Sequence, residues 1–445
     1  MARHFLQDVS SADVIDLRVD RPAVGGRMIA RHQGKIVLVG GAIPGERVQA
    51  VIEGVRRDVV FARAVEILES SPDRRSSIVR PSCGGRSFAH IAYARQLALK
   101  SEIVTDAFKR IGRINLDRLP PVAPSLETGY RMRARLHVVD TKIGFLDERS
   151  HRVCDVVGTG QLFPKTEDLI GSLGAEGKTL AEVGARAVEL AEDLAGDQCA
   201  LHVLVKEAHG WADEVLRDLA ASLPGVTGLS VASDIAAALP RRLLGTPYVS
   251  DTVGAFLPSS DAGTITLRRH AGAFFQANRY LVPELVQAVA ALVEGEELVD
   301  LYAGVGLFSV SIASMHTGSV VAVERDPTTG SDLATNGAPF ASTLCIVRAT
   351  VETYLKRCGS LTRATVIVDP PRTGLSRECV ARLARRRPLR IIYVSCDVAT
   401  QARDLRALGA SGYRVCEVRV FDMFPNTPHV ETVVALERMS GGEDR

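Results

Sequence analysis

The stretch Glu297–Phe308 constrains the fold of this 445-residue chain more than any other. A short apolar run turns at Gly304 and Gly306 and then enters a helix-like pattern. A second apolar run ends at Glu324, 18 residues after Gly306. Glycines let the backbone approach a nucleoside-bearing ligand, and an acid at the next strand end can accept hydrogen bonds from ribose hydroxyls. The stretch therefore predicts an open α/β sheet with a nucleoside-type cofactor.

Two cofactor classes fit this pattern, a dinucleotide and S-adenosylmethionine. Ser309 replaces the third glycine of the dinucleotide fingerprint, and the sequence contains no evident hydride-transfer site. The strand-like runs 414–421 and 430–436 are joined by a loop too short for a crossover helix, so they must pair antiparallel. Methyltransferase sheets end in this way, whereas nicotinamide-binding sheets do not. We favour S-adenosylmethionine, with an NAD-dependent enzyme as the alternative.

Two further strand ends carry reactive groups. Residues 366–374 form an apolar run that ends in Asp369 and a rigid diproline loop. Residues 391–405 predict a buried strand that delivers Ser395 and Cys396 to a loop before a helix. A thiol near the N–H groups of a helix start is expected to favour the thiolate, and so Cys396 is a candidate nucleophile. The alternative is a small buried hydrophobic residue.

Charge and cysteine content narrow the class of protein. The 54 Lys and Arg nearly balance the 52 Asp and Glu, so any nucleic-acid site must be local. Eight cysteines without paired spacing predict reduced thiols in a cytoplasmic protein. Residues 1–10 lack an apolar segment of signal-peptide length, and no apolar run approaches a membrane span. We expect a folded enzyme or binding protein with no membrane and no obligate protein partner.

The first seventy residues read as five short strands separated by glycine turns, which fits a small barrel of the OB type. Within them, Gly40–Val48 resembles the TRAM domain, an RNA-binding appendage of RNA-modifying enzymes. Residues 71–270 predict a central α+β domain, with an amphipathic linker helix at about 92–112.

A strand with strict alternation follows this helix. Residues 130–138 place apolar side chains on one face and Arg131, Arg133 and Arg135 on the other. Three arginines at two-residue spacing can follow a phosphate backbone. The alternative is a solvated sheet face without RNA.

Five segments in the same order resemble motifs of the RNA uracil-5-methyltransferase family, whose members use S-adenosylmethionine. The resemblance implies a Rossmann-like α/β methyltransferase domain at 271–445 with a terminal antiparallel hairpin, preceded by a TRAM-like OB barrel at 1–70 and the central α+β domain. The segments are residues 274–278, 300–308, 369–374, 393–396 with 402–405, and 422–425 with 429–431.

The resemblance also implies roles for individual residues. Cys396 is the expected nucleophile for carbon 6 of uracil, and Glu431 is the expected base for the proton on carbon 5. The cofactor would be held by Gln276, Tyr302, Gly304, Gly306, Glu324 and Asp369. The target uridine must leave its stack to reach Cys396. We expect an RNA partner, with 23S ribosomal RNA favoured over transfer RNA. A non-catalytic RNA-binding protein or RNA chaperone on the same scaffold is the alternative.

The chain departs from the family pattern at several positions. Asp397 and Val398 replace the usual Asn-Pro, and Thr350 replaces an Asn that often contacts the cofactor. The family commonly binds an iron–sulfur cluster through cysteines around a Cys-Gly-Gly-Cys core. In this sequence Arg86 and Thr159 stand where two of those ligands would be, and Cys83 is expected to have no other cysteine nearby. One thiolate cannot hold a four-cysteine cluster, so we predict neither a cluster nor a metal.

Overall fold

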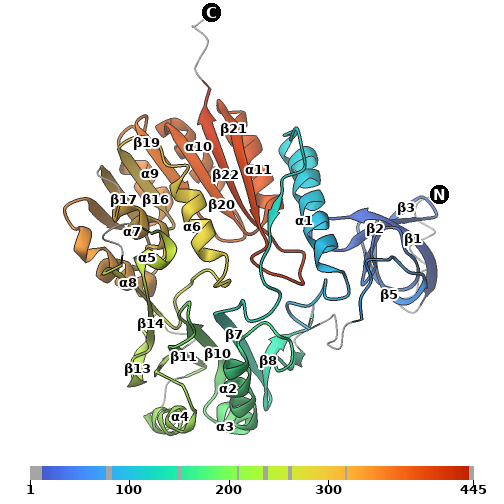
Figure 1. Ribbon diagram of the computed structural model, residues 1–445, viewed down its shortest axis with the longest axis horizontal. Coiled ribbons are helices and arrows are strands. Elements are labelled where there is room, and N and C mark those ends of the chain that lie inside the picture. The colour runs from blue at the N-terminus through green and yellow to red at the C-terminus, as the bar shows by residue number, and fades with distance from the viewer. Residues whose placement is uncertain are drawn as a thin grey trace, which may run out of the picture.

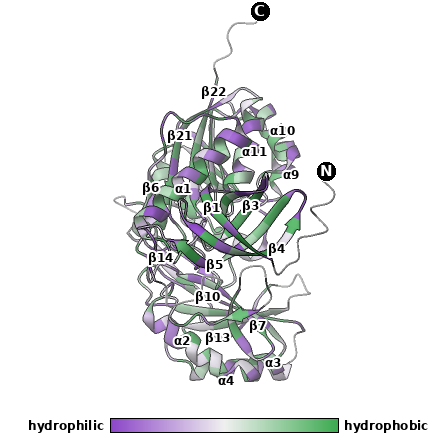
Figure 2. Cartoon of the chain, turned by 90° about the vertical axis from the view of Figure 1, so that its right-hand side faces the viewer, coloured by the Kyte–Doolittle hydropathy of each residue, from purple (hydrophilic) through white to green (hydrophobic). Residues whose placement is uncertain are grey.

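The computed structural model describes residues 13–76, 83–147, 150, 152–207, 210–233, 239–258, 263–315 and 318–439. The eight-stranded sheet of the C-terminal part and the seven-stranded central sheet lie at opposite ends of the molecule. The N-terminal barrel lies beside their junction (Figures 1 and 2).

The N-terminal unit is a closed five-stranded barrel in the order β1-β2-β3-β5-β4. Short strands with alternating apolar residues and glycine turns close in this way because one face of each strand must be buried. The barrel confirms the OB-type prediction. Its strands are β1 (Val14–Pro22), β2 (Met28–His32), β3 (Lys35–Gly40), β4 (Arg47–Arg56) and β5 (Val59–Glu69).

The central sheet has seven strands in the order β13-β12-β11-β10-β7-β8-β9. Its helices pack on one side over a separate apolar cluster. Its strands are β7 (Arg133–Val139), β8 (Lys142–Leu146), β9 (Val153–Cys154), β10 (Ala185–Glu192), β11 (Cys199–Val205), β12 (Gly228–Ser233) and β13 (Arg241–Gly245), and its helices are α2 (Pro164–Ala175), α3 (Gly177–Glu182) and α4 (Gly210–Ser222). The hairpin of β14 (Tyr248–Thr252) and β15 (Thr266–His270) follows.

The third unit is an eight-stranded sheet in the order β18-β17-β16-β19-β20-β22-β21-β6. Strands β16 to β20 are parallel, and β22 is antiparallel to both β20 and β21, as the short connecting loop requires. The strands are β6 (Val122–Ala123), β16 (Glu297–Leu301), β17 (Ser319–Glu324), β18 (Leu344–Arg348), β19 (Ala364–Val368), β20 (Arg390–Ser395), β21 (Tyr413–Phe421) and β22 (Glu431–Arg438).

Helices cover both faces of this sheet, each over its own apolar cluster. In Figure 2, α10 and α11 carry both hydrophilic and hydrophobic residues, as expected of helices with one face on a sheet. One layer contains α5 (Val253–Phe256), α6 (Val282–Ala290), α7 (Leu307–Ala313), α8 (Pro327–Gly337) and the 3-10 turn η2 (Ala338–Phe340), and the other contains α1 (Tyr93–Ala107), the π-helical turn η1 (Phe108–Gly112), α9 (Val351–Arg357), α10 (Arg377–Arg386) and α11 (Val398–Gly409).

The linker segment adds to this sheet. The sequence groups residues 92–112 with the central domain, but α1 and η1 share an apolar cluster with α11 on the face of the eight-stranded sheet. Strand β6 then pairs in parallel with β21 and forms the sheet edge. These contacts are non-local, so helical periodicity alone could not assign the segment to a partner.

A disulfide joins Cys83 to Cys154, which are 71 residues apart in the sequence. The prediction that all cysteines are reduced, and that Cys83 has no cysteine nearby, is therefore wrong for this pair. An isolated β-bridge between Cys83 and Asp147 and the pairing of β8 with β9 bring the two cysteines together. Among the residues that the structure describes, none of the helices is both long and apolar enough to cross a membrane.

Candidate active site and RNA-binding cleft

Cys396 and Glu431 come from neighbouring antiparallel strands. Ser395 ends β20 and is the register partner of Thr432 in β22, whose hydroxyl donates a 3.1 Å hydrogen bond to the Ser395 carbonyl. Cys396 follows Ser395, and Glu431 precedes Thr432. Both residues therefore lie at the same edge of the sheet, where the parallel strands also end. This edge is where open α/β sheets place their ligands.

Burial and a nearby carboxylate oppose the ionisation of the Cys396 thiol. Burial raises the pKa of the thiol to about 12, and the nearby Glu431 carboxylate adds to the shift. The Arg372 side chain acts in the opposite direction and stabilises a thiolate. Burial among carboxylates therefore works against the expected thiolate, and the position before a helix does not offset it.

Asp369 and Glu431 are buried acids whose pKa values are both raised. Burial is the main cause of a raised pKa for Asp369, to about 7, and the Asp300 carboxylate raises it further. Burial and then Asp369 raise the pKa of Glu431 well above its ordinary value, while Arg372 lowers it. Gln276 donates a 3.3 Å hydrogen bond to Asp369. Two carboxylates in one buried site resist simultaneous ionisation, so the pair retains protons at higher pH than exposed acids.

The predicted cofactor residues surround one glycine turn. Gly304 and Gly306 have φ angles of +57° and +94°, and an added Cβ at Gly304 would point into open space. Glu324 accepts a 2.8 Å hydrogen bond from the Gly304 amide. Tyr302, between β16 and the turn, holds a left-handed φ of +65°, which is unusual for a bulky residue. Buried Asp300 accepts from the Ser309 amide at 3.0 Å, and its second oxygen lacks a hydrogen-bond partner. These groups fit a nucleoside-bearing cofactor.

Two departures from the family pattern have local structural roles. Asp397 caps helix α11, and its carboxylate accepts a 2.8 Å hydrogen bond from the Thr400 amide. Val398 is then the first residue of that helix and is buried. Thr350 caps α9 and accepts from the Thr353 amide at 3.1 Å. Asp and Thr, like the Asn that each replaces, are good helix caps, so the starts of both helices are satisfied.

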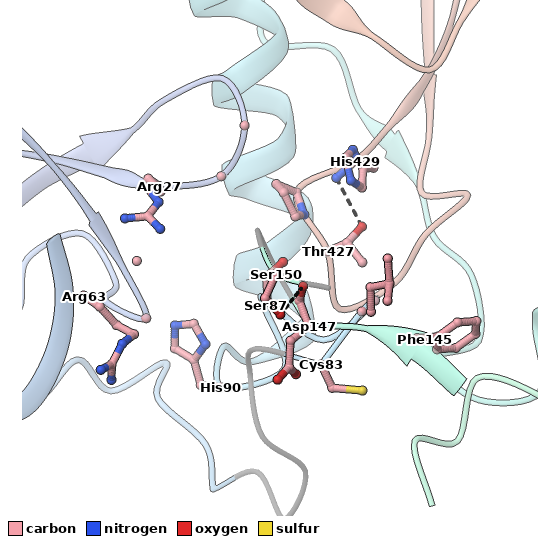
Figure 3. Close-up of a pocket in the computed structure, with 18 of the residues that line it drawn as sticks. Arg27, Arg63, Cys83, Ser87, His90, Phe145, Asp147, Ser150, Thr427 and His429 are labelled. Atoms are coloured by element: carbon pink, nitrogen blue, oxygen red, sulfur yellow. Dashed lines mark hydrogen bonds between the residues drawn. The ribbon is translucent and has the colours of Figure 1, made fainter. Parts of the chain in front are cut away.

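A cavity of about 1450 Å³ lies between the barrel, the central sheet and the loop that leads to Glu431. In Figure 3, Arg27 and Arg63 project from the barrel on one side, and His429 lies on the other. Arg372 also lines this cavity, so the cavity reaches the group beside Cys396.

The three predicted RNA-binding arginines differ in the ion pairs and hydrogen bonds that they form within the protein. Arg133 and Arg135 both form ion pairs with the buried carboxylate of Glu189, at 3.1 and 3.3 Å. Arg131 donates a 3.0 Å hydrogen bond to Gln161 and lines the cavity, as Arg135 does. The alternation predicted for this strand is confirmed, but Glu189 on β10 offsets part of the positive charge.

The residues at the cluster position do not fit an iron–sulfur cluster. The Cys83 sulfur is bonded to Cys154, and Arg86 donates a 2.8 Å hydrogen bond to the Thr159 carbonyl. Within the described part of the chain, no group of three or more His, Cys, Asp or Glu could hold a metal ion. The absence of a cluster stays a prediction, tested below.

The structure draws attention to three residues of the family-like motifs that were not among the predicted site residues. Arg372 influences both Cys396 and Glu431, and its only sequence signal is its position after the diproline. His429 lines the cavity, and burial with the nearby Arg372 lowers its pKa to about 4. Phe274, two residues before the predicted cofactor residue Gln276, is 61% exposed, which is unusual for a phenylalanine.

Comparisons with known proteins agree with this geometry. A model of the tRNA (uracil-5-)-methyltransferase family matches residues 341–439, and a TRAM domain model matches residues 12–65. An uncharacterized RNA methyltransferase of Thermotoga maritima is 30% identical over 440 residues, covering 94% of this chain and 98% of its own. The 23S rRNA (uracil(1939)-C(5))-methyltransferase RlmD of Methylococcus capsulatus is 29% identical over 445 residues, covering 96% and 98%.

A solved structure is similar over nearly the whole chain. It is the Pyrococcus abyssi tRNA (uracil-54, C5)-methyltransferase in complex with S-adenosyl-L-homocysteine. The TM-score is 0.72 and the sequence identity 25%, with 94% of this chain and 99% of that chain covered. With its Rossmann-like sheet, TRAM barrel and family motifs, this chain belongs to the RNA uracil-5-methyltransferase family, whose members depend on S-adenosylmethionine.

Proposed function

We propose that this protein methylates carbon 5 of a uridine in structured RNA, with 23S ribosomal RNA favoured over transfer RNA. The reaction proceeds through a covalent adduct between Cys396 and the uracil. The observation that carries the proposal is the pairing of β20 with β22, which brings the ends bearing Cys396 and Glu431 to one sheet edge beside Arg372.

Cys396 supplies the nucleophile. Carbon 5 of uracil is a poor nucleophile, so the thiol first releases its proton to solvent and the resulting thiolate sulfur bonds to carbon 6. The electron pair of the 5,6 double bond then passes to the carbon 4 oxygen and gives an enolate that is nucleophilic at carbon 5. Arg372 supports this step because its positive charge favours the thiolate.

Glu431 completes the reaction as the base. After carbon 5 has been methylated, it carries both the methyl group and its original proton. Glu431 removes that proton, the 5,6 double bond reforms, and the bond between carbon 6 and sulfur breaks. The cysteine is thereby regenerated, and no oxidant or reductant is needed.

The cofactor would occupy the glycine turn. S-adenosylmethionine supplies the methyl group as an electrophile when bound. Glu324 would accept from the ribose, Tyr302 and Gln276 would flank the cofactor, and Gly304 and Gly306 would let the backbone approach it. Asp369 lies between this group and Glu431, so it would contact the cofactor or the target base.

RNA would lie in the cavity between the barrel and the loop that leads to Glu431. Arg27 and Arg63 line its barrel side, and Arg131 and Arg135 line the side of the central sheet. Lysine and arginine contacts to phosphates supply most of the sequence-independent affinity for RNA. The ribosomal assignment is supported by the relative named as a 23S rRNA methyltransferase, although the similar solved structure is named for tRNA.

The test is methyl transfer from labelled S-adenosylmethionine to total RNA from cells that lack this protein. Wild type is compared with Cys396→Ala, and the labelled nucleoside and RNA fragment are identified. Label in 5-methyluridine, formed only by wild type, is the expected result, and the fragment identifies the RNA. Cofactor binding without transfer to any RNA would contradict the proposal and favour an RNA-binding protein on this scaffold.

A further inference from the structure

The loop between β21 and β22, residues 422–429, determines where the proposed base lies. It leads directly into Val430 and Glu431, and four of its residues line the cavity: Phe424, Thr427, Pro428 and His429. A displacement of this loop would therefore move both the cavity wall and Glu431. What holds the loop in place thus bears on catalysis.

Helix α1 lies beside the loop (Figure 1) and contacts it at two points. Lys100 forms an ion pair with Asp422, both side chains being fully buried, and donates to the Phe424 carbonyl at 3.1 Å. One turn earlier, Gln96 donates to the Asn426 side-chain oxygen at 3.0 Å and accepts from the Asn426 amide at 2.9 Å. Residues four apart share one helix face, so the same face of α1 contacts the start and the middle of the loop.

Asn426 also receives contacts from the segment that joins the barrel to α1. Arg75 donates to the Asn426 side-chain oxygen at 2.7 Å, and the Phe88 amide donates to the Asn426 carbonyl, also at 2.7 Å. Arg75 is itself paired with Glu127. Asn426 is therefore a junction between the catalytic loop, helix α1 and the barrel connection.

The conformation of Asn426 explains its residue type. Its φ angle is +65°, a left-handed conformation that Asn, Asp and Gly adopt most readily. Its exposed fraction is 3%. Glycine would satisfy the backbone but would lose the oxygen that accepts from Gln96 and Arg75. Aspartate would satisfy both the backbone and the two donors.

The barrel touches the same loop. Gly26, in the turn between β1 and β2, packs so closely on Pro428 that an added Cβ would overlap the proline ring. A shift of the barrel would therefore be transmitted to the loop through the contacts at Pro428 and Asn426.

We propose that Asn426 is a positioning residue for the base Glu431: it ties the catalytic loop to α1 and to the barrel connection, so that the RNA-binding side of the cleft sets the position of Glu431. This inference rests on the proposed function, since it takes Glu431 as the base. It predicts a defect in proton removal from carbon 5 rather than in cofactor binding.

The test compares Asn426→Gly with the conservative Asn426→Asp and with the control Asp140→Gly. Asp140 is an exposed residue in the turn between β7 and β8 with a similar φ of +55°. Hydrogen exchange is measured for peptides that cover residues 421–431. Exchange should be about tenfold faster in Asn426→Gly only, because two buried hydrogen bonds are lost. Unchanged exchange would overturn the proposal whatever the activity.

The second readout uses total RNA from cells that lack this protein and labelled S-adenosylmethionine. Turnover by Asn426→Gly should fall about 10- to 100-fold, since small displacements of a catalytic group have effects of this size. Labelled methyl groups should accumulate in a covalent complex of protein and RNA on denaturing gels. Cofactor affinity should stay within about twofold, and Asn426→Asp should keep turnover within about threefold.

The outcomes separate this inference from the proposed function. If Asn426→Gly speeds exchange but turns over like wild type, the positioning role is wrong. Loss of turnover in Asn426→Asp to the level of Asn426→Gly would also overturn it, because the accepting oxygen would then be irrelevant. If wild type labels no RNA, the proposed function fails, and with it the role of Asn426 in positioning a base.

Discussion

Ser395 and Thr432 lie directly opposite each other in the antiparallel pairing of β20 and β22, and a hydrogen bond joins them. The neighbouring residues Cys396 and Glu431 are consequently carried to the same edge by two strands of opposite direction. A nucleophile and a base for the same uracil ring must reach it from a fixed separation. The sheet register sets which backbone positions lie opposite each other, and the loop that leads into Glu431 completes the placement of the base.

Substitution of the two residues should stop the reaction at different steps. Cys396→Ala should abolish both methyl transfer and covalent RNA complexes, because no sulfur is available for carbon 6. Glu431→Gln should accumulate the methylated adduct and slow product release about 100-fold or more. Denaturing gels with labelled S-adenosylmethionine distinguish the two. Free 5-methyluridine formed by Glu431→Gln at the wild-type rate would contradict the role of Glu431.

The rate at which free 5-methyluridine forms should rise with pH between about 6 and 9, because the Cys396 thiolate is needed for addition and the Glu431 carboxylate for release. Burial and Asp369 raise the pKa of Glu431, and burial raises that of Cys396 to about 12, so both active forms are deprotonated and scarce at low pH. At most about a tenfold rise per pH unit is expected for each proton lost. Single-turnover rates measured at saturating cofactor test this.

Arg372→Gln provides the matched control for the pH profile. Removal of its positive charge should raise both pKa values and move the profile to higher pH. A rate that is independent of pH in wild type, or an unshifted profile in Arg372→Gln, would be inconsistent with this electrostatic arrangement.

Replacement of Arg131, Arg133 and Arg135 by Ala should weaken RNA binding about tenfold or more and reduce its salt dependence, while cofactor affinity stays unchanged. Among the single variants, Arg131→Ala should have the largest effect, because Arg133 and Arg135 share the Glu189 carboxylate. Filter binding at several salt concentrations measures this. The exposed Arg186 on β10 is the control, and equal losses of RNA and cofactor binding would indicate misfolding instead.

The disulfide should contribute to stability and replace two reactive thiols. Closure of a segment of 71 residues is expected to stabilise the fold by about 2–4 kcal/mol. Dithiothreitol should therefore lower the melting temperature of wild type by several degrees but not that of a Cys83→Ser, Cys154→Ser variant. The exposed free cysteines Cys345 and Cys416, both changed to Ser, serve as the control pair.

Thiol counting and iron analysis test the same region chemically. Alkylation of unfolded, unreduced protein should modify six cysteines, whereas all eight react after reduction. Protein purified without oxygen should contain no stoichiometric iron and no visible cluster absorbance. Eight reactive thiols without reduction would refute the disulfide, and bound iron would refute the predicted absence of a cluster.

Local patterns in the sequence were sufficient to predict the fold and to propose Gly304, Gly306 and Glu324 as cofactor residues. The glycine turn at 304–306, the strand that ends just before Cys396 and the short loop after β21 depend on interactions between residues close in sequence. Strand alternation in the barrel is equally local. Such patterns fix which face of an element is buried and where it must turn.

Only the tertiary structure decided which distant groups meet. The disulfide spans 71 residues, and the contact of Gln96 with Asn426 spans 330. Glu189 reaches the arginine strand through the pairing of β10 with β7, and the raised pKa of Cys396 arises from burial beside Glu431. Burial and charge proximity depend on the packing of whole elements, which no local pattern encodes.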